Sequence, residues 1–176
     1  MPATRKSKQT EPKIVKRPRQ KMAVVVAQGD PNVALPKVLP ALYGSVYTLK
    51  FDLKKAGKET FKVGALFGRW PDLTDKPKGQ WTGVVGLPVP ANTRKLPQKD
   101  PNLEVKLDTW DYGGAVAEIL HIGAYSEEET TVQRLHEFIE REGYQIVGAH
   151  EEEYLTSPRA KVQKTLIRYP VVKKKG

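Results

Sequence analysis

The chain has 176 residues, 39% of them hydrophobic and 28% charged, which suits one domain or two small fused modules with a proper core. It contains no cysteine, which excludes a disulfide framework, a thiol nucleophile and a zinc–cysteine site. The net charge of +10 comes entirely from the ends, because residues 1–21 carry +7 and residues 173–175 carry +3. Residues 22–172 are therefore formally neutral and have no overall attraction for phosphate.

The two ends are predicted to be basic tails. Residues 1–21 contain three prolines and are too short to bury a core, so we expect a disordered arm there and a second short tail at 173–176. The first tail could hold nucleic acid or an acidic partner weakly, although a solvated arm is the more ordinary interpretation. No apolar run is long enough to span a membrane, and the start of the chain has no apolar signal core. We therefore expect a cytoplasmic protein.

The first half of the folded part predicts the order strand, helix, strand, strand. An apolar run ends at the turn sequence Gly29-Asp30-Pro31-Asn32, and a helical pattern of apolar residues then continues to Gly57. Four prolines within residues 88–103 indicate a linker, which we place at 90–103. The expected elements are a strand over 22–27, a helix over 36–55, and strands over 61–70 and 80–89.

The second half predicts the same order after one additional strand. Ser126-Glu127-Glu128-Glu129 has the spacing of a capping box that opens a helix, and Gly143 ends that helix. The nearly continuous apolar run over 115–122 is typical of a central strand. The expected elements are strands over 104–112 and 115–122, the helix over 126–143, and strands over 144–155 and 162–171.

Small sequence echoes support an internal duplication. Val63-Gly64-Ala65 matches Val147-Gly148-Ala149 at an offset of 84 residues, and Leu87-Pro88-Val89 resembles Tyr169-Pro170-Val171 at an offset of 82. We therefore predict an α+β fold with two pseudo-repeated modules, 22–89 and 104–172, whose antiparallel sheets are backed by two helices. A cleft at the junction of two such modules is a natural ligand site.

The segment 144–155 is the strongest functional pointer in the sequence. If one strand spans it, Glu152 lies on an inward surface beside the ring of Tyr154. A carboxylate there must be paired, protonated or available to a ligand. The alternatives are a surface glutamate or one paired with Arg168, and Glu151 and Glu153 are expected to be solvated on the other face. The residues predicted to share the inward face are Tyr144, Ile146, His150, Glu152 and Tyr154.

Three motifs in the second half carry a family resemblance. They are the turn His121-Ile122-Gly123-Ala124-Tyr125, the acidic strand end Glu152-Glu153-Tyr154-Leu155, and the final strand with Thr165, Arg168 and Pro170-Val171. Together they resemble the GyrI-like small-molecule-binding domain, with Ala124 in place of the usual proline. The first half is similar more loosely, so the resemblance covers about residues 22–172 and is strong from 115 onward.

The resemblance implies two strand-helix-strand-strand modules around a central cleft that holds hydrophobic, often cationic or electrophilic, small molecules. Members include effector-binding domains of multidrug-responsive regulators and hydrolases of cyclopropane-bearing compounds. The glutamate of the family's "Glu-x-Tyr" pattern carries over to Glu152. The chain has no pair of periodic helices before residue 36 that could form a helix-turn-helix, so a complete regulator is not expected.

The main prediction is a stand-alone module that binds a hydrophobic, aromatic or cationic small molecule around Glu152. One alternative is a hydrolase in which Glu152 is the general acid or base and Tyr154 assists; another is an interaction protein that uses the basic tail. We expect no cofactor and no metal, because the histidines are scattered and no phosphate loop is present. The ligand and the oligomeric state are left open. The predicted ligand-binding residues are Trp70, Trp110, Tyr112, His121, Glu152 and Tyr154.

Overall fold

The computed structural model describes residues 10–71, 73 and 75–176. The described chain divides into two compact units: the first unit is residues 19–110, and the second unit is residues 10–18 with 111–176. Each unit holds an antiparallel sheet and one long helix, which confirms the predicted α+β class. Among the described residues, no helix is both long and apolar enough to cross a membrane.

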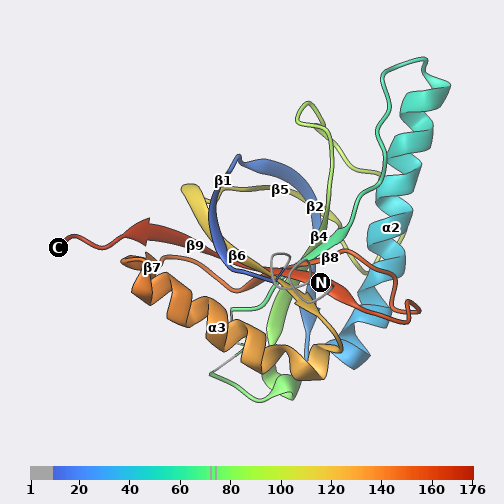
Figure 1. The fold of residues 1–176 in the computed structure, drawn as a ribbon. Coiled ribbons are helices and arrows are strands. Elements are labelled where there is room, and N and C mark those ends of the chain that lie inside the picture. The colour runs from blue at the N-terminus through green and yellow to red at the C-terminus, as the bar shows by residue number, and fades with distance from the viewer. Residues whose placement is uncertain (1–9, 72, 74) are drawn as a thin grey trace. The chain divides into compact units, whose positions relative to one another are not determined.

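The first unit is a four-stranded antiparallel sheet with the order β3-β4-β2-β5 (Figure 1). Its apolar core lies between the sheet and α2, where Leu42 and Val46 are completely buried. The nonregular segment after β4 contributes Leu96 and Val105 to that core, so the predicted linker packs as part of the unit. The elements are β2 (Gln20–Gln28), α2 (Pro31–Lys55), β3 (Leu66–Arg69), the short 3-10 helix η1 (Lys78–Gln80), β4 (Thr82–Pro88) and β5 (Lys106–Trp110).

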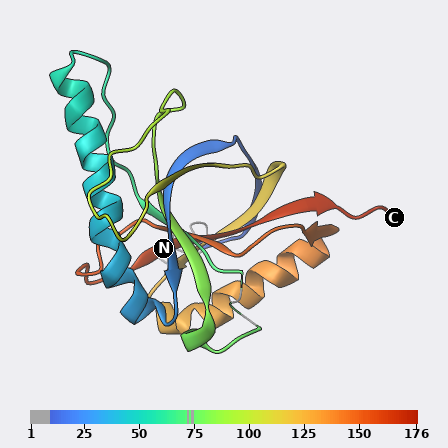
Figure 2. The same ribbon diagram turned by 180° about the vertical axis from the view of Figure 1, so that it is seen from behind.

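Helix α2 begins five residues before the predicted start at Pro36. The side chain of Asp30 accepts a hydrogen bond from the backbone N–H of Asn32 at 2.9 Å and so caps the helix. Pro31 then occupies the first turn, where a missing N–H costs nothing. The C-terminal turns of α2 extend past the strands of its own unit (Figure 2), and β3 is shorter than the predicted strand over 61–70.

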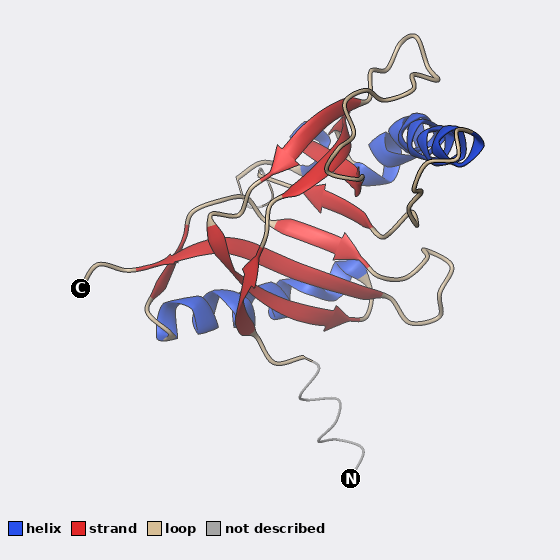
Figure 3. Ribbon diagram, turned by 90° about the horizontal axis from the view of Figure 1, so that it is seen from above, coloured by secondary structure: helices blue, strands red, loops and turns tan. Residues whose placement is uncertain are grey.

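The second unit has the strand order β1-β6-β9-β8, again antiparallel, and β7 also pairs with β9. Helix α3 lies along one face of these strands (Figure 3), and its buried Leu135 and Ile139 pack on Ile119 and Ile167. The elements are β1 (Lys13–Arg17), β6 (Gly114–Ile122), the 3-10 helix η2 (Tyr125–Glu127), α3 (Glu128–Arg141), β7 (Tyr144–Ile146), β8 (Glu151–Tyr154) and β9 (Lys164–Lys173).

Several predicted boundaries differ from the structure. Residues 13–17 fall in the predicted disordered tail, yet they form β1 against β6, because Ile14 packs on the core of the second unit. Residues 1–9 of that tail lie outside the described residues. Strand β5 falls in the predicted second module but belongs to the first unit. The predicted strand over 144–155 is broken after β7, where Gly148 approaches Pro170 so closely that a Cβ would lie 2.7 Å from its ring.

The two units repeat one order of elements, as the sequence echoes predict. The first unit runs β2, α2, β3, β4, and the second runs β6, α3, β8, β9 with the short β7 added. In each, the first strand pairs with the last, and the last also pairs with the strand after the helix. The echo at 63–65 ends directly before β3, and the echo at 147–149 ends one residue before β8, so both lead into equivalent strands.

Candidate functional site

Glu152 lies on the face of its sheet that α3 covers. It sits opposite Ile167 in the β8–β9 ladder, and Ile167 belongs to the core beneath α3. Side chains alternate between the faces of a strand, so Glu152 and Tyr154 share this face. Only 6% of Glu152 is exposed, which rules out the alternative of a solvated surface glutamate.

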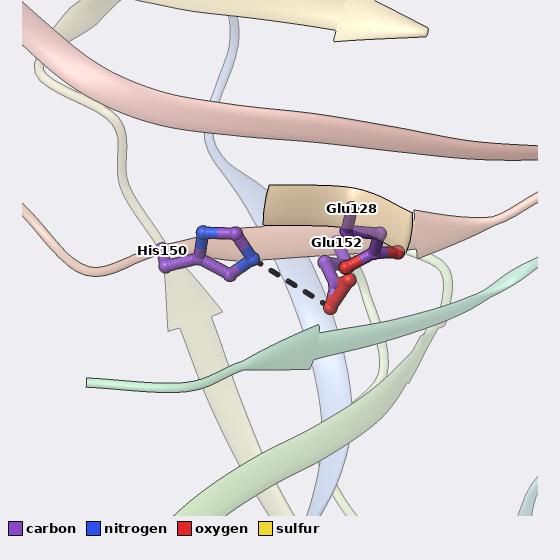
Figure 4. A group of neighbouring side chains, drawn as sticks. All are labelled: Glu128, His150 and Glu152. Atoms are coloured by element: carbon purple, nitrogen blue, oxygen red, sulfur yellow. Dashed lines mark ion pairs between the residues drawn. The ribbon is translucent and has the colours of Figure 1, made fainter. Parts of the chain in front are cut away.

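Glu128 and His150 meet Glu152 on that face (Figure 4). One polar atom from each of the three lies within 4.8 Å of the others. The Nε2 atom of His150 is 3.6 Å from Oε2 of Glu152, and Nδ1 is 2.6 Å from the hydroxyl of Tyr169. Glu128 is the first residue of α3, so the start of the helix brings a second carboxyl group to the first.

The two carboxyl groups have opposite protonation tendencies. Burial and the neighbouring negative charge of Glu152 raise the pKa of Glu128 to about 10. Burial also opposes ionisation of Glu152, but polar contacts with His150 and the Glu128 carboxyl outweigh it and lower the pKa of Glu152. At neutral pH the pair therefore consists of a neutral acid beside a carboxylate, and the two groups share one proton.

Tyrosine rings stand beside Glu152. The hydroxyl of Tyr154 is 3.5 Å from Oε2 of Glu152, and the ring of Tyr125 meets that of Tyr154 edge to face at 5.9 Å. Tyr125 is 46% exposed, so the aromatic edge of the site reaches solvent. Burial and the charge of Glu152 raise the pKa of Tyr125, so this side chain stays a neutral phenol.

The opposite face of the same strands carries a buried ion network centred on Arg168. Arg168 is fully buried on β9, and its register neighbours are Glu118 on β6 and Glu151 on β8. The guanidinium lies 3.4 Å from Glu118, 2.8 Å from Glu151 and 2.6 Å from Glu153. The prediction that Glu151 and Glu153 are solvated is therefore wrong. The predicted alternation of faces is correct, but the face with Glu151 and Glu153 is buried, and both carboxylates pair with Arg168.

Two predicted site residues of the second unit make structural contacts. Tyr112 is buried and donates a hydrogen bond to Glu151 at 2.8 Å, which places it with the Arg168 network rather than on the face of Glu152. His121 is on the α3 face, where Nε2 donates to the carbonyl of Ala124 at 2.9 Å and Nδ1 contacts the hydroxyl of Thr131 at 2.7 Å. Both nitrogens of His121 are thus engaged by the turn and the helix.

The two predicted tryptophans belong to the first unit. Trp70 is 4% exposed, forms part of the apolar core and lies 6.1 Å from the ring of Trp81. Trp110 is 1% exposed, and the guanidinium of Arg69 lies 4.0 Å from its ring centre, a cation–π contact. A separate open depression of about 530 Å³ in this unit contains none of the predicted site residues; it is lined by residues 59–62 and 88–92.

Comparison with known proteins identifies the family. The profile of the GyrI-like small molecule binding domain matches residues 10–171, nearly the whole chain. The chain belongs to the GyrI-like small-molecule-binding family. No curated protein sequence matches it significantly.

Solved structures share the GyrI-like fold. An uncharacterized conserved protein from Listeria innocua is 26% identical, with 93% of each chain covered and a TM-score of 0.82. A hydrolase from Listeria innocua is 25% identical, with the same coverage and a TM-score of 0.77. The C-terminal domain of EcmrR is 13% identical, covers 94% of this chain and 99% of its own, and has a TM-score of 0.66, which shows a common fold alone.

The sequence analysis does not predict three residues of the candidate site: Glu128, His150 as a polar partner, and Tyr125. The sequence predicts Glu128 as part of a capping box, but η2 precedes α3 and the N-cap residue Glu127 makes no side-chain capping bond, and Glu128 is turned toward Glu152 on the sheet. The spacing of His150 and Glu152, two residues apart on one face, was a usable signal. Contact with the helix start depends on tertiary packing and had no local signature.

Proposed function

We propose that the chain binds an organic cation with an apolar body, and that Glu152 is the anionic centre of the site. The observation that supports this most directly is a carboxylate with a lowered pKa that is buried beside Tyr154. A buried charge is costly to desolvate, and an organic cation would offset that cost. Family membership already gives small-molecule binding; the charge and the rings argue for this class of ligand.

The tyrosines give the site a preference for quaternary cations. Flat rings attract a cation through their electron-rich faces, and the effect is worth about 0.5–1 kcal/mol at an exposed contact and about 2 kcal/mol at a desolvated one. Tyr154 stands next to Glu152, and the exposed Tyr125 continues the aromatic surface outward. Trp70, Trp110 and Tyr112 remain predicted wall residues, and the proposal does not depend on them.

A matched ligand pair tests the proposal. Benzyltrimethylammonium and neopentylbenzene have the same shape but differ by one positive charge. We expect wild type to bind the cation roughly tenfold more tightly than neopentylbenzene, a difference of about 1.4 kcal/mol. Glu152→Gln should lose that preference, because it lacks the negative charge. Glu129→Gln, an exposed neighbour of Glu128, is the control and should bind as wild type does. Equal affinities of wild type and Glu152→Gln for the cation would refute the proposal.

Hydrolysis of an electrophile is a second candidate, favoured by the neutral Glu128 beside the ionised Glu152. A pair of titratable groups with divergent pKa values can serve as acid and base. A structural neighbour at 25% identity is named a hydrolase. With a cyclopropane conjugated to a carbonyl, the oxygen of water would bond to a ring carbon while the ring bond breaks toward the carbonyl. Glu152 would accept the proton from water, and Glu128 would supply the proton that ends on the product.

Mass spectrometry separates binding from turnover. The chain would be incubated with such a cyclopropane, and a product heavier by one water would be measured over time. We expect Glu152→Gln and Glu128→Gln to abolish product formation and Tyr154→Phe to reduce it. Stoichiometric binding with no product in wild type would refute the hydrolase and support binding only.

A further inference from the structure

The cluster of Glu128, His150 and Glu152 also has the donor set of a metal site. It offers one imidazole nitrogen and two carboxylate oxygens, all within 4.8 Å of one another. Catalytic zinc sites combine three protein ligands of these types and leave one coordination position open. In a tetrahedral site with bonds of about 2.1 Å, neighbouring ligand atoms lie roughly 3.4 Å apart. The pair formed by His150 and Glu152, at 3.6 Å, already has nearly this spacing.

A second observation concerns the buried ring nitrogen Nε2 of His150, which faces the carboxylate of Glu152. The His150 side chain is 3% exposed, and its Nε2 makes no hydrogen bond within the described part of the chain. Figure 4 shows this nitrogen directed at Glu152, at a distance beyond ordinary hydrogen-bond reach. Buried polar atoms nearly always have a partner, and an orphaned one is costly. A metal ion between His150 and the two carboxylates would satisfy this atom.

The other nitrogen of His150 has the partner that a metal ligand requires. Nδ1 is 2.6 Å from the hydroxyl of the buried Tyr169. If Nδ1–H donates to that oxygen, the neutral ring presents the lone pair of Nε2 to the cluster. Outer contacts of this kind fix the tautomer and the ring orientation of metal-binding histidines. Tyr169 is itself fixed in the core beneath α3.

We propose that Glu128, His150 and Glu152 form a binding site for one divalent transition-metal ion of the zinc type. Imidazole favours such ions over Mg²⁺ and Ca²⁺. Metal binding would release the proton of Glu128, and the two resulting carboxylates would balance the ionic charge. The most separated ligand atoms must draw together by up to about 1.4 Å, which the Glu128 side chain can provide from the first turn of α3. The site goes beyond the proposed function, and because both use Glu152, metal and organic cation should compete.

Cobalt titration tests the site directly. Untagged full-length chain would be stripped with EDTA, dialysed and titrated with Co²⁺, and the visible absorption would report on coordination geometry. We expect saturation at one Co²⁺ per chain with the intense bands of a low-coordinate site, and displacement of Co²⁺ by Zn²⁺ but not by Mg²⁺. His150→Ala and Glu128→Gln should weaken binding by at least roughly a hundredfold, and Tyr169→Phe by about 10–100-fold.

His136→Ala is the matched control. His136 is an exposed histidine of α3 whose ring lies 4.9 Å from that of Tyr169, so it touches the same neighbour without belonging to the cluster. Its loss should leave the titration unchanged. Unaltered Co²⁺ bands in His150→Ala, or no stoichiometric Co²⁺ binding by folded wild type, would overturn the site. The near-ultraviolet circular dichroism of His150→Ala will show whether this variant keeps the wild-type fold. If it does not, the nearly isosteric Glu128→Gln replaces it, and unaltered Co²⁺ bands in Glu128→Gln would overturn the site.

The metal site and the organic-cation site fail in different experiments. Benzyltrimethylammonium binding measured in EDTA involves no metal, so its loss in Glu152→Gln tests only the proposed function. Co²⁺ binding measured without organic ligand tests only the metal site. When both are present, Co²⁺ should weaken benzyltrimethylammonium binding in wild type and leave it unchanged in His150→Ala.

Discussion

Strands β3 and β8 occupy equivalent positions in the two units, yet they carry opposite chemistry. At the 84-residue offset, Leu66-Phe67-Gly68-Arg69 corresponds to His150-Glu151-Glu152-Glu153. Both strands pair with the last strand of their repeat, so the backbone role is the same. Gly68 stands where the second unit has Glu152. The strand arrangement is therefore repeated in both units, whereas the candidate carboxylate is present only in the second.

The two units also differ in how they are stabilised. At the 82-residue offset, Arg168 on β9 corresponds to Gly86 on β4. A Cβ at Gly86 would lie 2.9 Å from the carbonyl of Ala23, so the first unit uses close backbone packing at this position. The second unit instead holds a buried arginine among three carboxylates, an arrangement that is costly to desolvate and very sensitive to loss of one partner.

Replacing Arg168 should lower the unfolding free energy more than any other change proposed, and it tests whether the second unit depends on its ion network. Arg168→Met removes the buried cation that Glu118, Glu151 and Glu153 share, and we expect the unfolding free energy to fall by about 3–5 kcal/mol. Urea denaturation would measure this. The exposed Arg159→Met is the control and should change stability by no more than about 0.5 kcal/mol. A similarly small loss for Arg168→Met would mean that the network contributes little.

Titration of Glu128 should give the next largest effect. Its pKa is raised to about 10 by burial and by Glu152, so the folded chain holds a proton that the unfolded chain releases above about pH 4.5. The contribution of Glu128 to the unfolding free energy is therefore fully present below about pH 4.5 and declines as pH rises toward 10. The effect is limited because the half-buried Glu128 can turn toward water at the start of α3.

Glu128→Gln keeps the shape of the protonated acid and removes the titration. In EDTA, the decline in unfolding free energy between pH 5 and 9 should be shallower in this variant than in wild type. Glu129→Gln, at an exposed neighbouring position, should retain the wild-type slope. Parallel pH profiles for wild type and Glu128→Gln would show that Glu128 is ionised in the folded chain at neutral pH.

Gly83→Ala tests the tight packing of the first unit. A Cβ at Gly83 would clash with the six-membered ring of the Trp70 indole, which lies directly on the glycine. The ring must shift, and such overpacking costs about 1–3 kcal/mol. Gly79→Ala is the matched control, because a Cβ there meets nothing within 4 Å. Quenching or a shift of tryptophan fluorescence in Gly83→Ala alone would locate the change at Trp70, whereas equal stability of the two variants would contradict the contact.

The sequence predicted what depends on local pattern and missed what depends on packing between elements. Alternation along β8 correctly put Glu152 and Tyr154 on one inward face, and the echoes correctly predicted the repeated order. The partners of Glu151 were missed because Arg168 is 17 residues away and meets it only through the β8–β9 register. Glu128 was missed because its position depends on η2, which sets the direction in which α3 begins.

Helix capping should give the smallest difference between the units. Asp30 caps α2 through its hydrogen bond to Asn32, whereas the residue before α3, Glu127, makes no such bond. Asp30→Ala should therefore cost about 1 kcal/mol of unfolding free energy, and Glu127→Ala close to none. Asp30→Asn would retain an acceptor and most of the stability. If Glu127→Ala were as costly as Asp30→Ala, the start of α3 would be held by its side chain after all, and Glu128 would owe its position to that cap rather than to the turn before it.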